Sequence, residues 1–377
     1  MNTSPGNNKA ELSASKPIPG GRLEIDLAAI LENYSLLQRL NPNSEIGAVV
    51  KADAYGLGVS RIAPLLAGAG ARHFFLAQLQ EALTLKPLLP DDAVFYVMNG
   101  LSPGEEDVCA ASGCVPVLNT LSQAKAWAAA ARRDEKLPAA LQFETGMSRF
   151  GLSPADIDAI MVGGAIRAGL DIKMVMSHLA CADEPAHEAN DDQAARFLKM
   201  AERFPGVPTS LSNSAPGLLG DRPCDVIRAG LALYGAEPLN DRTISLKPVV
   251  KLFGRVMQVK KLEPGAGVGY GLTYVAQSAT RIATIGVGYA DGWPRALGNR
   301  GAAYMGDVRL PAVGRISMDS FSIDISAAPE GALKEGDLVE LIGPHQSVEQ
   351  VAAAADTISY EILTRLGARL ERVYAEV

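Results

Sequence analysis

Chemically active side chains follow five separate apolar runs of this sequence: Lys51, Arg149, His178, Asn213, Ser214 and Arg228. Lys51 comes directly after the apolar stretch "IGAVV", and a buried lysine is costly unless its amine is paired or forms a covalent bond. A buried lysine whose pKa is lowered can bond covalently to an aldehyde. Combined with hydroxyl groups and glycines that can hold a phosphate, this lysine favours pyridoxal phosphate (PLP) as the cofactor.

Each of these residues also has an ordinary structural explanation. A lysine can extend its aliphatic stem to the surface, and a lone histidine in a core is more often simply hydrogen-bonded. Ser214 after Asn213 fits a helix cap, and Arg228 could pair with Asp225. We favour the functional explanation because chance would scatter such residues over both ends of the strands.

Other catalytic and binding patterns do not fit the sequence. It has no GxSxG motif, and its glycine-rich "GAGVGYG" is not a GxGxxG motif that opens a helix. We expect no metal site, because His187-Glu188 lacks the second histidine of a zinc motif and the cysteines fit no common zinc spacing. Four cysteines are too few for a disulfide scaffold, so we expect reduced thiols, which are typical of a cytoplasmic protein.

The elements that carry these residues alternate in type along the chain. Helix-period segments separate most of the compact apolar runs, which are "IGAVVKA", "HFFLAQ", "AVFYVMNG", "CVPVLNT", "ALQFETG", "IKMVMSHLA", "PTSLSNS" and "DVIRAGLALYG". This alternation predicts an α/β fold with a parallel sheet, and eight runs favour a closed (β/α)8 TIM-type barrel. Active sites of such barrels lie at the C-terminal ends of the strands, where the chemically active residues fall.

The sequence divides into three segments. Residues 1–21 are rich in Asn, Ser, Pro and Gly, lack the apolar core of a signal peptide, and are expected to form a flexible arm. Residues 22–240 are expected to form the barrel that binds PLP. Short strands and turns dominate the remainder, which predicts a mainly β C-terminal domain over residues 241–377, with the boundary between about Ala236 and Leu246.

The composition limits the classes of partner. The 377 residues are 48% hydrophobic, and the formal net charge of −7 arises from both signs mixed along the chain. The sequence lacks the basic patch of nucleic-acid-binding proteins, and no apolar run reaches the length of a membrane span. We therefore expect no nucleic-acid or membrane partner and a cytoplasmic location.

Nine blocks of the sequence, in order, resemble the alanine racemase family: "AVVKADAYG", "TGMSRFG", "SHLACADE", "SNSAPG", "IRAGLALYG", "GYGLTY", "IGVGYADG", "GRISMD" and "TISYEIL". The resemblance implies a PLP barrel followed by a β domain. It also implies a head-to-tail homodimer in which the β domain of one subunit completes the active site of the other. The implied activity is the interconversion of L-alanine and D-alanine, which supplies D-alanine for peptidoglycan.

The resemblance implies individual roles as well. Lys51, joined to PLP as an aldimine, resembles the base on one face of the substrate Cα, and Tyr270 of the partner subunit resembles the base on the opposite face. The residues implied to hold the cofactor are Lys51, Tyr55, His178, Asn213, Ser214, Arg228, Gly230, Leu231 and Tyr360. The residues implied to contact the substrate or its entrance are Arg149, Met318, Tyr289 and Asp319.

These residue types are physically consistent with the implied chemistry. Racemisation removes a proton from one face of a carbon and returns one to the other face, which requires two acid–base groups. Lysine and tyrosine have high reference pKa values, so burial or cationic neighbours must tune both groups. Arg228 beside the ring nitrogen could not accept a proton, so we expect a shorter-lived carbanion and fewer side reactions.

The sequence leaves two properties undetermined: what orients Arg149, and which activity the protein has. Gln142 stands where many family members carry a carbamylated lysine that positions the substrate-binding arginine, so we expect neutral hydrogen bonds or a bound anion to orient Arg149. The second is the activity itself. The alternatives are a broad-specificity amino-acid racemase, a PLP-dependent decarboxylase and, from another class, a non-catalytic PLP-binding protein.

Overall fold

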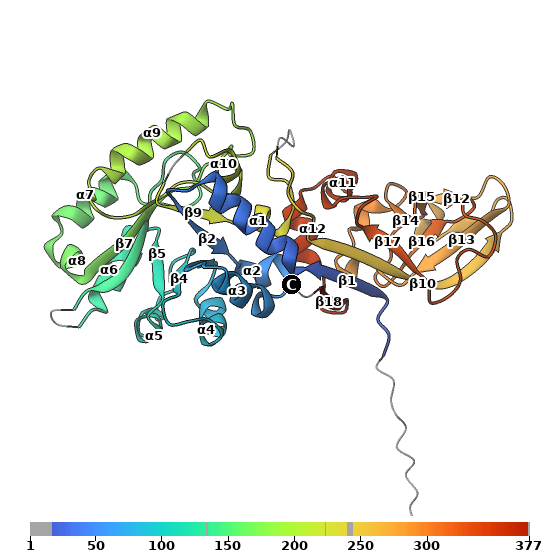
Figure 1. Ribbon diagram of the computed structural model, residues 1–377, viewed down its shortest axis with the longest axis horizontal. Coiled ribbons are helices and arrows are strands. Elements are labelled where there is room, and N and C mark those ends of the chain that lie inside the picture. Colours follow the sequence, from blue (N-terminus) through green and yellow to red (C-terminus); the bar gives the residue numbers. More distant parts are fainter. Residues whose placement is uncertain (1–16, 133–134, 223, 240–243, 376–377) are drawn as a thin grey trace, which may run out of the picture.

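The computed structural model describes residues 17–132, 135–222, 224–239 and 244–375, which form two adjoining parts (Figure 1). One part is a barrel of parallel strands with helices outside it, and the other consists mainly of antiparallel strands. Residues 1–16, most of the expected N-terminal arm, lie outside the described residues, as do residues 240–243 at the expected domain boundary.

Eight parallel strands form the barrel sheet: β2 (Glu45–Val49), β3 (His73–Leu76), β4 (Val94–Val97), β5 (Val115–Leu118), β6 (Leu137–Gln142), β7 (Leu170–Met176), β8 (Thr209–Ser210) and β9 (Val226–Ala229). Their hydrogen-bonded order is β8-β7-β6-β5-β4-β3-β2-β9. Each strand coincides with one of the apolar runs of the sequence. The expected (β/α)8 barrel is therefore confirmed.

The barrel closes between β8 and β9 through bonds beyond the regular ladder. The Ser210 hydroxyl donates to the Val226 carbonyl at 2.6 Å. The backbone N–H of Arg228 donates to the Ser212 carbonyl at 3.0 Å. These bonds hold the strand that carries Arg228 beside the segment that leads to Ser214.

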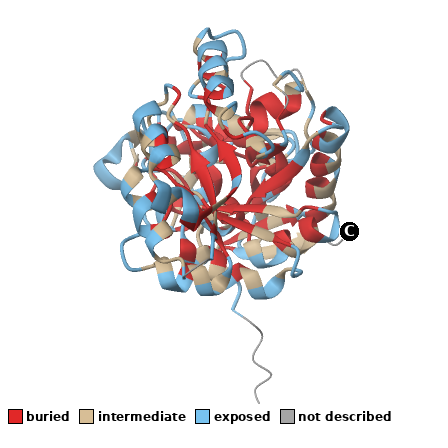
Figure 2. Ribbon diagram, turned by 90° about the vertical axis from the view of Figure 1, so that its left-hand side faces the viewer, coloured by how far each residue is buried: buried red, intermediate tan, exposed pale blue. Residues whose placement is uncertain are grey.

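Helices with exposed outer faces surround the buried strands (Figure 2). They are α1 (Leu27–Leu40), α2 (Lys51–Gly56), α3 (Val59–Gly68), α4 (Leu79–Leu85), α5 (Glu106–Ser112), α6 (Leu121–Ala129), α7 (Pro154–Val162), α8 (Gly164–Gly169), α9 (Ala189–Ala201) and α10 (Ser214–Leu219). Side-chain caps fix the N-termini of several helices. At the start of α1, the Asp26 carboxylate accepts a hydrogen bond from the N–H of Ala29. Among the helices that the structure describes, none combines the length and the apolar character needed to cross a membrane.

The C-terminal part is built on an eight-stranded sheet of order β13-β16-β15-β14-β17-β10-β1-β18. Its strands are β1 (Gly21–Asp26), β10 (Val250–Leu262), β13 (Thr280–Ile285), β14 (Ala302–Met305), β15 (Val308–Val313), β16 (Phe321–Asp324), β17 (Leu338–Ile342) and β18 (Glu371–Ala375). The hairpin β11 (Gly267–Val268) and β12 (Tyr274–Val275) and the helices α11 (Val348–Ala354) and α12 (Ser359–Arg365) complete it. Short 3-10 helices are η1 (Lys86–Leu88), η2 (Leu231–Tyr234), η3 (Tyr270–Leu272), η4 (Tyr289–Asp291) and η5 (Arg295–Leu297). The expected mainly β C-terminal domain is confirmed.

The strand that precedes the barrel in sequence belongs to this second sheet. β1 pairs antiparallel with β10 and parallel with β18. The described chain therefore starts in the C-terminal sheet, builds the barrel, and then returns. This return also places α12 against α2 at the barrel mouth, where the rings of Tyr360 and Tyr55 lie 5.9 Å apart.

Candidate active site

A cavity of about 650 Å³ lies at the C-terminal ends of the barrel strands. All the barrel residues singled out in the sequence line it together with one residue of α12: Lys51, Tyr55, Arg149, His178, Asn213, Ser214, Arg228, Gly230, Leu231 and Tyr360. These residues follow different strands and meet because the carboxyl ends of parallel strands share one end of the barrel.

Lys51 begins a turn with an unusual backbone. The next residues, Ala52, Asp53, Ala54 and Tyr55, have φ angles of 52°, 56°, 52° and 58°, in the left-handed helical region. Non-glycine residues in this region cost about 1–2 kcal/mol each. Such strain persists where surrounding contacts fix it, and it is concentrated at functional sites.

Hydrogen bonds from other elements hold this turn in place. The Glu81 carboxylate, in the first turn of α4, accepts from the N–H of Ala52 at 2.7 Å. The carbonyl of Gly56 accepts from Nη2 of Arg372 in β18 at 2.9 Å. Both the barrel and the C-terminal sheet therefore stabilise the backbone that follows Lys51.

The surroundings of Lys51 favour its neutral amine. Burial lowers the pKa of Lys51 most, and the positive charges of Arg149 and Arg228 lower it further. The negative charge of Glu81 acts against them and raises this pKa. A neutral amine is both a nucleophile and a base, so Lys51 is suited to covalent and proton-transfer chemistry.

One side of the cavity is suited to a phosphate. The Ser214 hydroxyl accepts from the N–H groups of Gly230 at 2.9 Å and Ala232 at 3.3 Å. A Cβ on residue 230 would come within 2.4 Å of the Tyr55 hydroxyl, so glycine keeps this space open. Burial raises the pKa of Tyr55 and raises that of Tyr360 to about 12, so both hydroxyls stay protonated donors near neutral pH.

Arg228 and His178 form a second polar group in the cavity. The buried guanidinium of Arg228 donates to the carbonyls of Ser210 at 2.7 Å and Ser177 at 2.6 Å, and contacts Nδ1 of His178 at 3.2 Å. Because a guanidinium only donates, Nδ1 of His178 accepts. Burial, and then the charge of Arg228, lowers the pKa of His178 to about 3. The imidazole is therefore neutral beside a charged donor.

Arg149 is exposed at the rim of the cavity, in the loop that follows β6. The N–H of Leu152 donates to the Gln142 carbonyl at 2.7 Å and closes the base of this loop. Nε2 of Gln142 also donates to the carbonyl of Phe150 at 3.3 Å. A neutral hydrogen bond thus fixes the peptide between Phe150 and Gly151, one residue beyond Arg149, and what orients the Arg149 guanidinium stays a prediction.

Four residues of the expected set lie outside the cavity, in the C-terminal part: Tyr270, Tyr289, Met318 and Asp319. Tyr270 begins η3 between the strands of the β11–β12 hairpin and is 72% exposed. Figure 1 shows β12 at the end of the C-terminal sheet that is remote from the barrel. Within one chain, the structure does not bring Tyr270 to Lys51.

Among the residues that the structure describes, the N–H of Met318 has no hydrogen-bond acceptor. The N–H of Tyr289 donates to the Ser317 carbonyl at 3.0 Å, and the N–H of Ala290 donates to the Met318 carbonyl at 2.9 Å. The Met318 N–H shares a peptide plane with the Ser317 carbonyl and points the opposite way. It therefore faces away from the η4 loop and is available to a ligand.

Arg369 clamps this pair of loops to the segment after α12. Its guanidinium donates to both carboxylate oxygens of the buried Asp291, at 2.8 and 2.9 Å, and to Asp319 at 2.7 Å. Bidentate pairing of this kind restricts orientation as well as distance. The clamp joins the exposed loops around Met318 to the helix that carries Tyr360.

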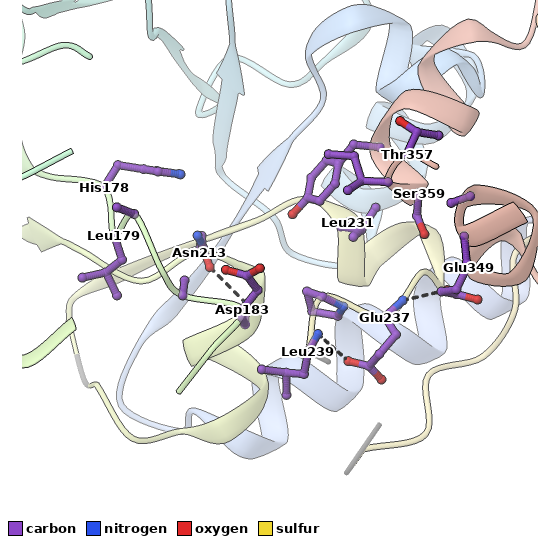
Figure 3. Close-up of a pocket in the computed structure, with 18 of the residues that line it drawn as sticks. His178, Leu179, Asp183, Asn213, Leu231, Glu237, Leu239, Glu349, Thr357 and Ser359 are labelled. Atoms are coloured by element: carbon purple, nitrogen blue, oxygen red, sulfur yellow. Dashed lines mark hydrogen bonds between the residues drawn. The ribbon is translucent and has the colours of Figure 1, made fainter. Parts of the chain in front are cut away.

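A second groove, of about 670 Å³, adjoins the cavity, and Figure 3 shows it with His178 at its border. His178 and Tyr360 line both the groove and the cavity. Figure 3 shows Asp183 and Glu237 among its polar residues, and Glu349 of α11 accepts a hydrogen bond from the N–H of Glu237 at 3.0 Å. Loops of the barrel and helices of the C-terminal part both border this groove. The cavity therefore continues into a depression with acidic side chains.

The cavity residues fit PLP. Lys51 offers an amine to its aldehyde, and the space beside Gly230 offers the Tyr55 and Ser214 hydroxyls to its phosphate. Arg228 offers a charged donor to its ring nitrogen. In the part of the chain that the structure describes, no three His, Cys, Asp or Glu side chains gather closely enough to hold a metal ion.

The sequence did not point to three residues that support the site: Glu81, Tyr234 and Arg369. The Tyr234 ring lies 4.7 Å from that of Tyr55, and its hydroxyl donates to the Val49 carbonyl at 2.8 Å. Each contacts a segment distant in sequence, so no local pattern marks it.

Two family models match the chain. "Alanine racemase, N-terminal domain" matches residues 25–238, and "Alanine racemase, C-terminal domain" matches residues 249–374. An alanine racemase of Brucella ovis is 51% identical over 373 residues, covering 95% of this chain and 94% of that protein. A catabolic alanine racemase of Agrobacterium fabrum is 49% identical over 358 residues, covering 94% of this chain and 92% of that protein.

Solved structures resemble the whole fold. The Bartonella henselae alanine racemase with covalently bound pyridoxal phosphate is 40% identical, with a TM-score of 0.91, covering 95% of this chain and 100% of that one. The biosynthetic alanine racemase of Pseudomonas aeruginosa is 33% identical, with a TM-score of 0.87 and the same coverage, 95% and 100%. The similarity extends over both parts of the described chain.

Proposed function

The chain belongs to the alanine racemase family, and we propose that Lys51 and Tyr270 of the partner subunit are its two acid–base groups in interconverting L-alanine and D-alanine. The family domains and their relatives identify a PLP-dependent isomerase of alanine. One observation carries the assignment of roles. The Lys51 amine lies in a cavity whose burial and cationic groups lower its pKa, next to hydroxyls that fit a phosphate.

PLP, when bound, withdraws electrons from the substrate Cα and makes its proton removable. The hydroxyls of Tyr55, Tyr360 and Ser214 would hold the phosphate, with the neighbouring N–H of Leu231. The N–H of Gly230 donates to the Ser214 hydroxyl and would be shared with the phosphate. Arg228 would donate to the ring nitrogen. Because a guanidinium keeps its proton, Arg228 would not protonate that nitrogen and would limit the electron withdrawal.

Lys51 serves one face of the substrate. Its neutral amine removes the Cα proton of the enantiomer whose proton faces it. When that enantiomer is formed from the other one, the protonated amine delivers a proton to the same face. The opposite face needs a second group of this kind. We assign it to Tyr270, which is exposed and lies in the β11–β12 hairpin, outside the cavity of its own chain.

A head-to-tail homodimer would bring Tyr270 to the cavity of the neighbouring chain. Tyr270 is 72% exposed and Leu272 is 61% exposed, so both offer large apolar surfaces to an interface. In such a dimer Arg149 of one chain and the Met318 N–H of the other would hold the substrate carboxylate. Tyr289 and Asp319, on the same loops as Met318, would border the entrance.

The physiological role we propose is the supply of D-alanine for peptidoglycan in the cytoplasm. Relatives are named both catabolic and biosynthetic, and either direction uses the same proton transfers. All four cysteines are free thiols, as is usual in a reducing compartment.

Chiral analysis of products tests the function. With PLP added, we expect L-alanine to approach an equal mixture of enantiomers, while L-serine, L-lysine and L-arginine keep their handedness. The opposite pattern would indicate a racemase for other amino acids, and release of CO₂ would indicate a decarboxylase. Tyr270→Phe separates an enzyme from a binding protein, because a racemase loses turnover while its PLP absorbance persists.

A further inference from the structure

The carboxylate of Glu81 connects two segments at the edge of the site. Oε2 accepts from the N–H groups of Ala77 at 2.7 Å and Gln78 at 3.0 Å, which fixes the carboxylate at the start of α4. Oε1 accepts from the N–H of Ala52, the residue after Lys51, at 2.7 Å. One half-buried side chain thus joins the α4 start to the left-handed turn α2.

This bond acts directly on the backbone of Lys51. The Ala52 N–H and the Lys51 carbonyl belong to one rigid peptide plane, so fixing the N–H fixes ψ of Lys51. The N–H of Val50 is held by the Phe75 carbonyl at 3.0 Å on the other side of the lysine. The Val50 carbonyl, in the peptide directly before Lys51, accepts from the N–H of Ala54 at 3.0 Å within the turn. The only bond from another element to the peptide directly after Lys51, among the described residues, is therefore the one from Glu81.

We propose that Glu81 is a positioning residue for Lys51, which holds the left-handed turn so that the amine points into the cavity. The proposal rests on the proposed role of Lys51. Without the Glu81 contact, the Ala52 peptide can rotate towards the right-handed conformations that non-glycine residues prefer. The amine would then spend less time within reach of the cofactor and of the substrate Cα.

Glu81 also sets the charge around the amine. The titratable and charged groups near Lys51 from the surrounding elements are Tyr55, Glu81, Arg149, His178, Arg228, Tyr360 and Glu361. Glu361 is already paired with Arg365 at 3.0 Å. Arg149 and Arg228 favour the neutral amine, whereas Glu81 favours the ammonium form that returns a proton. Both forms are needed in a reversible proton transfer.

Two variants test the proposal. Glu81→Gln removes the charge and replaces one acceptor oxygen with a donor, whereas Glu81→Asp keeps the charge but is too short to span both segments. For the PLP-loaded enzyme we expect kcat to fall about ten- to hundredfold in both variants, with KM for alanine changed little because Arg149 is untouched. Glu105→Gln is the matched control, since Glu105 accepts from the N–H of Ser102 at the start of α5.

A second readout does not depend on turnover. Reductive methylation of the full-length PLP-free chain at a series of pH values, followed by peptide mass spectrometry, gives the pH midpoint for Lys51. We expect this midpoint to move to lower pH in Glu81→Gln and to stay unchanged in Glu81→Asp and Glu105→Gln. Unchanged kcat in both Glu81 variants, or a lower melting temperature with an unchanged kcat per PLP, would overturn the proposal.

The outcome is separable from failure of the proposed function. If Lys51 does not hold the cofactor, borohydride treatment of the wild-type enzyme leaves no pyridoxyl group on it. If only the Glu81 proposal fails, the pyridoxyl group is found on Lys51 in the wild type and in both variants, with full activity.

Discussion

Single residues in the cavity are held in charge states that their surroundings impose. Burial and the two nearby arginines favour a neutral Lys51, and burial keeps the Tyr55 hydroxyl protonated. His178 is neutral because burial lowers its pKa most, and because protonation would also place a second positive charge beside buried Arg228. These shifts favour a base at Lys51, a hydroxyl donor to a phosphate at Tyr55 and a neutral neighbour for the ring at His178.

The depressed pKa of His178 predicts a pH dependence of stability. The unfolded chain binds a proton at this residue below about pH 6.5, whereas the folded chain does so only near pH 3. Stability therefore falls as the pH decreases through this window, since the unfolded state binds more protons. We expect His178→Gln, whose amide oxygen can still accept from Arg228, to flatten that fall between about pH 7 and pH 5. Urea unfolding at a series of pH values measures the free energy of unfolding of the wild type and of His178→Gln.

Exposed His187 provides the control for this prediction. His187→Gln, which removes a histidine from the surface, is measured alongside the wild type and His178→Gln under the same conditions. An equal slope for His178→Gln and the wild type would mean that the histidine titrates normally in the folded chain.

Substitution of Gly230 tests the proposed phosphate site sterically. In Gly230→Ala the new Cβ would meet the Tyr55 hydroxyl at 2.4 Å and displace it. We expect PLP to bind about tenfold or more weakly, as for loss of a hydrogen bond to a charged group, measured by absorbance titration. Adding Tyr55→Phe should cause little further loss, because the same contact is already gone. Tight PLP binding by Gly230→Ala would place the phosphate elsewhere.

At the scale of elements, the local sequence predicted the barrel strands, because each strand has its own apolar pattern. The eight barrel strands appear as apolar runs because strands buried on both faces need continuous Val, Ile, Leu and Phe. The convergence of Lys51, His178 and Arg228 follows from the rule that parallel strands share one end. The sequence therefore predicted the barrel and the residues around its mouth.

Contacts between distant segments were not predictable in this way. β1 pairs with β18, at the opposite end of the sequence, so no local pattern assigns it to the C-terminal sheet. The left-handed turn after Lys51 contradicts the preference of Ala, Asp and Tyr for right-handed conformations. Glu81 and Arg372 stabilise it from outside, and their contribution is visible only in three dimensions.

The Arg369 clamp predicts an effect on substrate binding. Lysine cannot pair with both oxygens of Asp291 and also reach Asp319, so Arg369→Lys should loosen the loop that presents the Met318 N–H. We expect KM for alanine to rise about fivefold with kcat nearly unchanged, because only carboxylate binding is weakened. Arg365→Lys, which affects the exposed pair with Glu361, is the control. If kcat falls while KM stays constant, the clamp does not serve substrate binding.

At the scale of the whole molecule, the chain separates the two proposed acid–base groups. Lys51 lines the cavity at the mouth of the barrel. Tyr270 lies in the β11–β12 hairpin, and Figure 1 shows β12 at the end of the C-terminal sheet that is remote from the barrel. One chain alone therefore lacks a complete two-base site. The proposed head-to-tail dimer resolves this, because each cavity would receive Tyr270 of the partner subunit.

Mixing two inactive variants tests this central claim most directly. Lys51→Ala and Tyr270→Phe are purified separately, checked for folding, and then dissociated and reassociated together before alanine racemisation is measured. A mixed dimer holds one site with both native groups, so random pairing should restore about one quarter of wild-type activity. The double variant Lys51→Ala/Tyr270→Phe mixed with either single variant should restore none. Failure of the two single variants to complement each other, although mixed dimers form, would contradict a site shared between subunits.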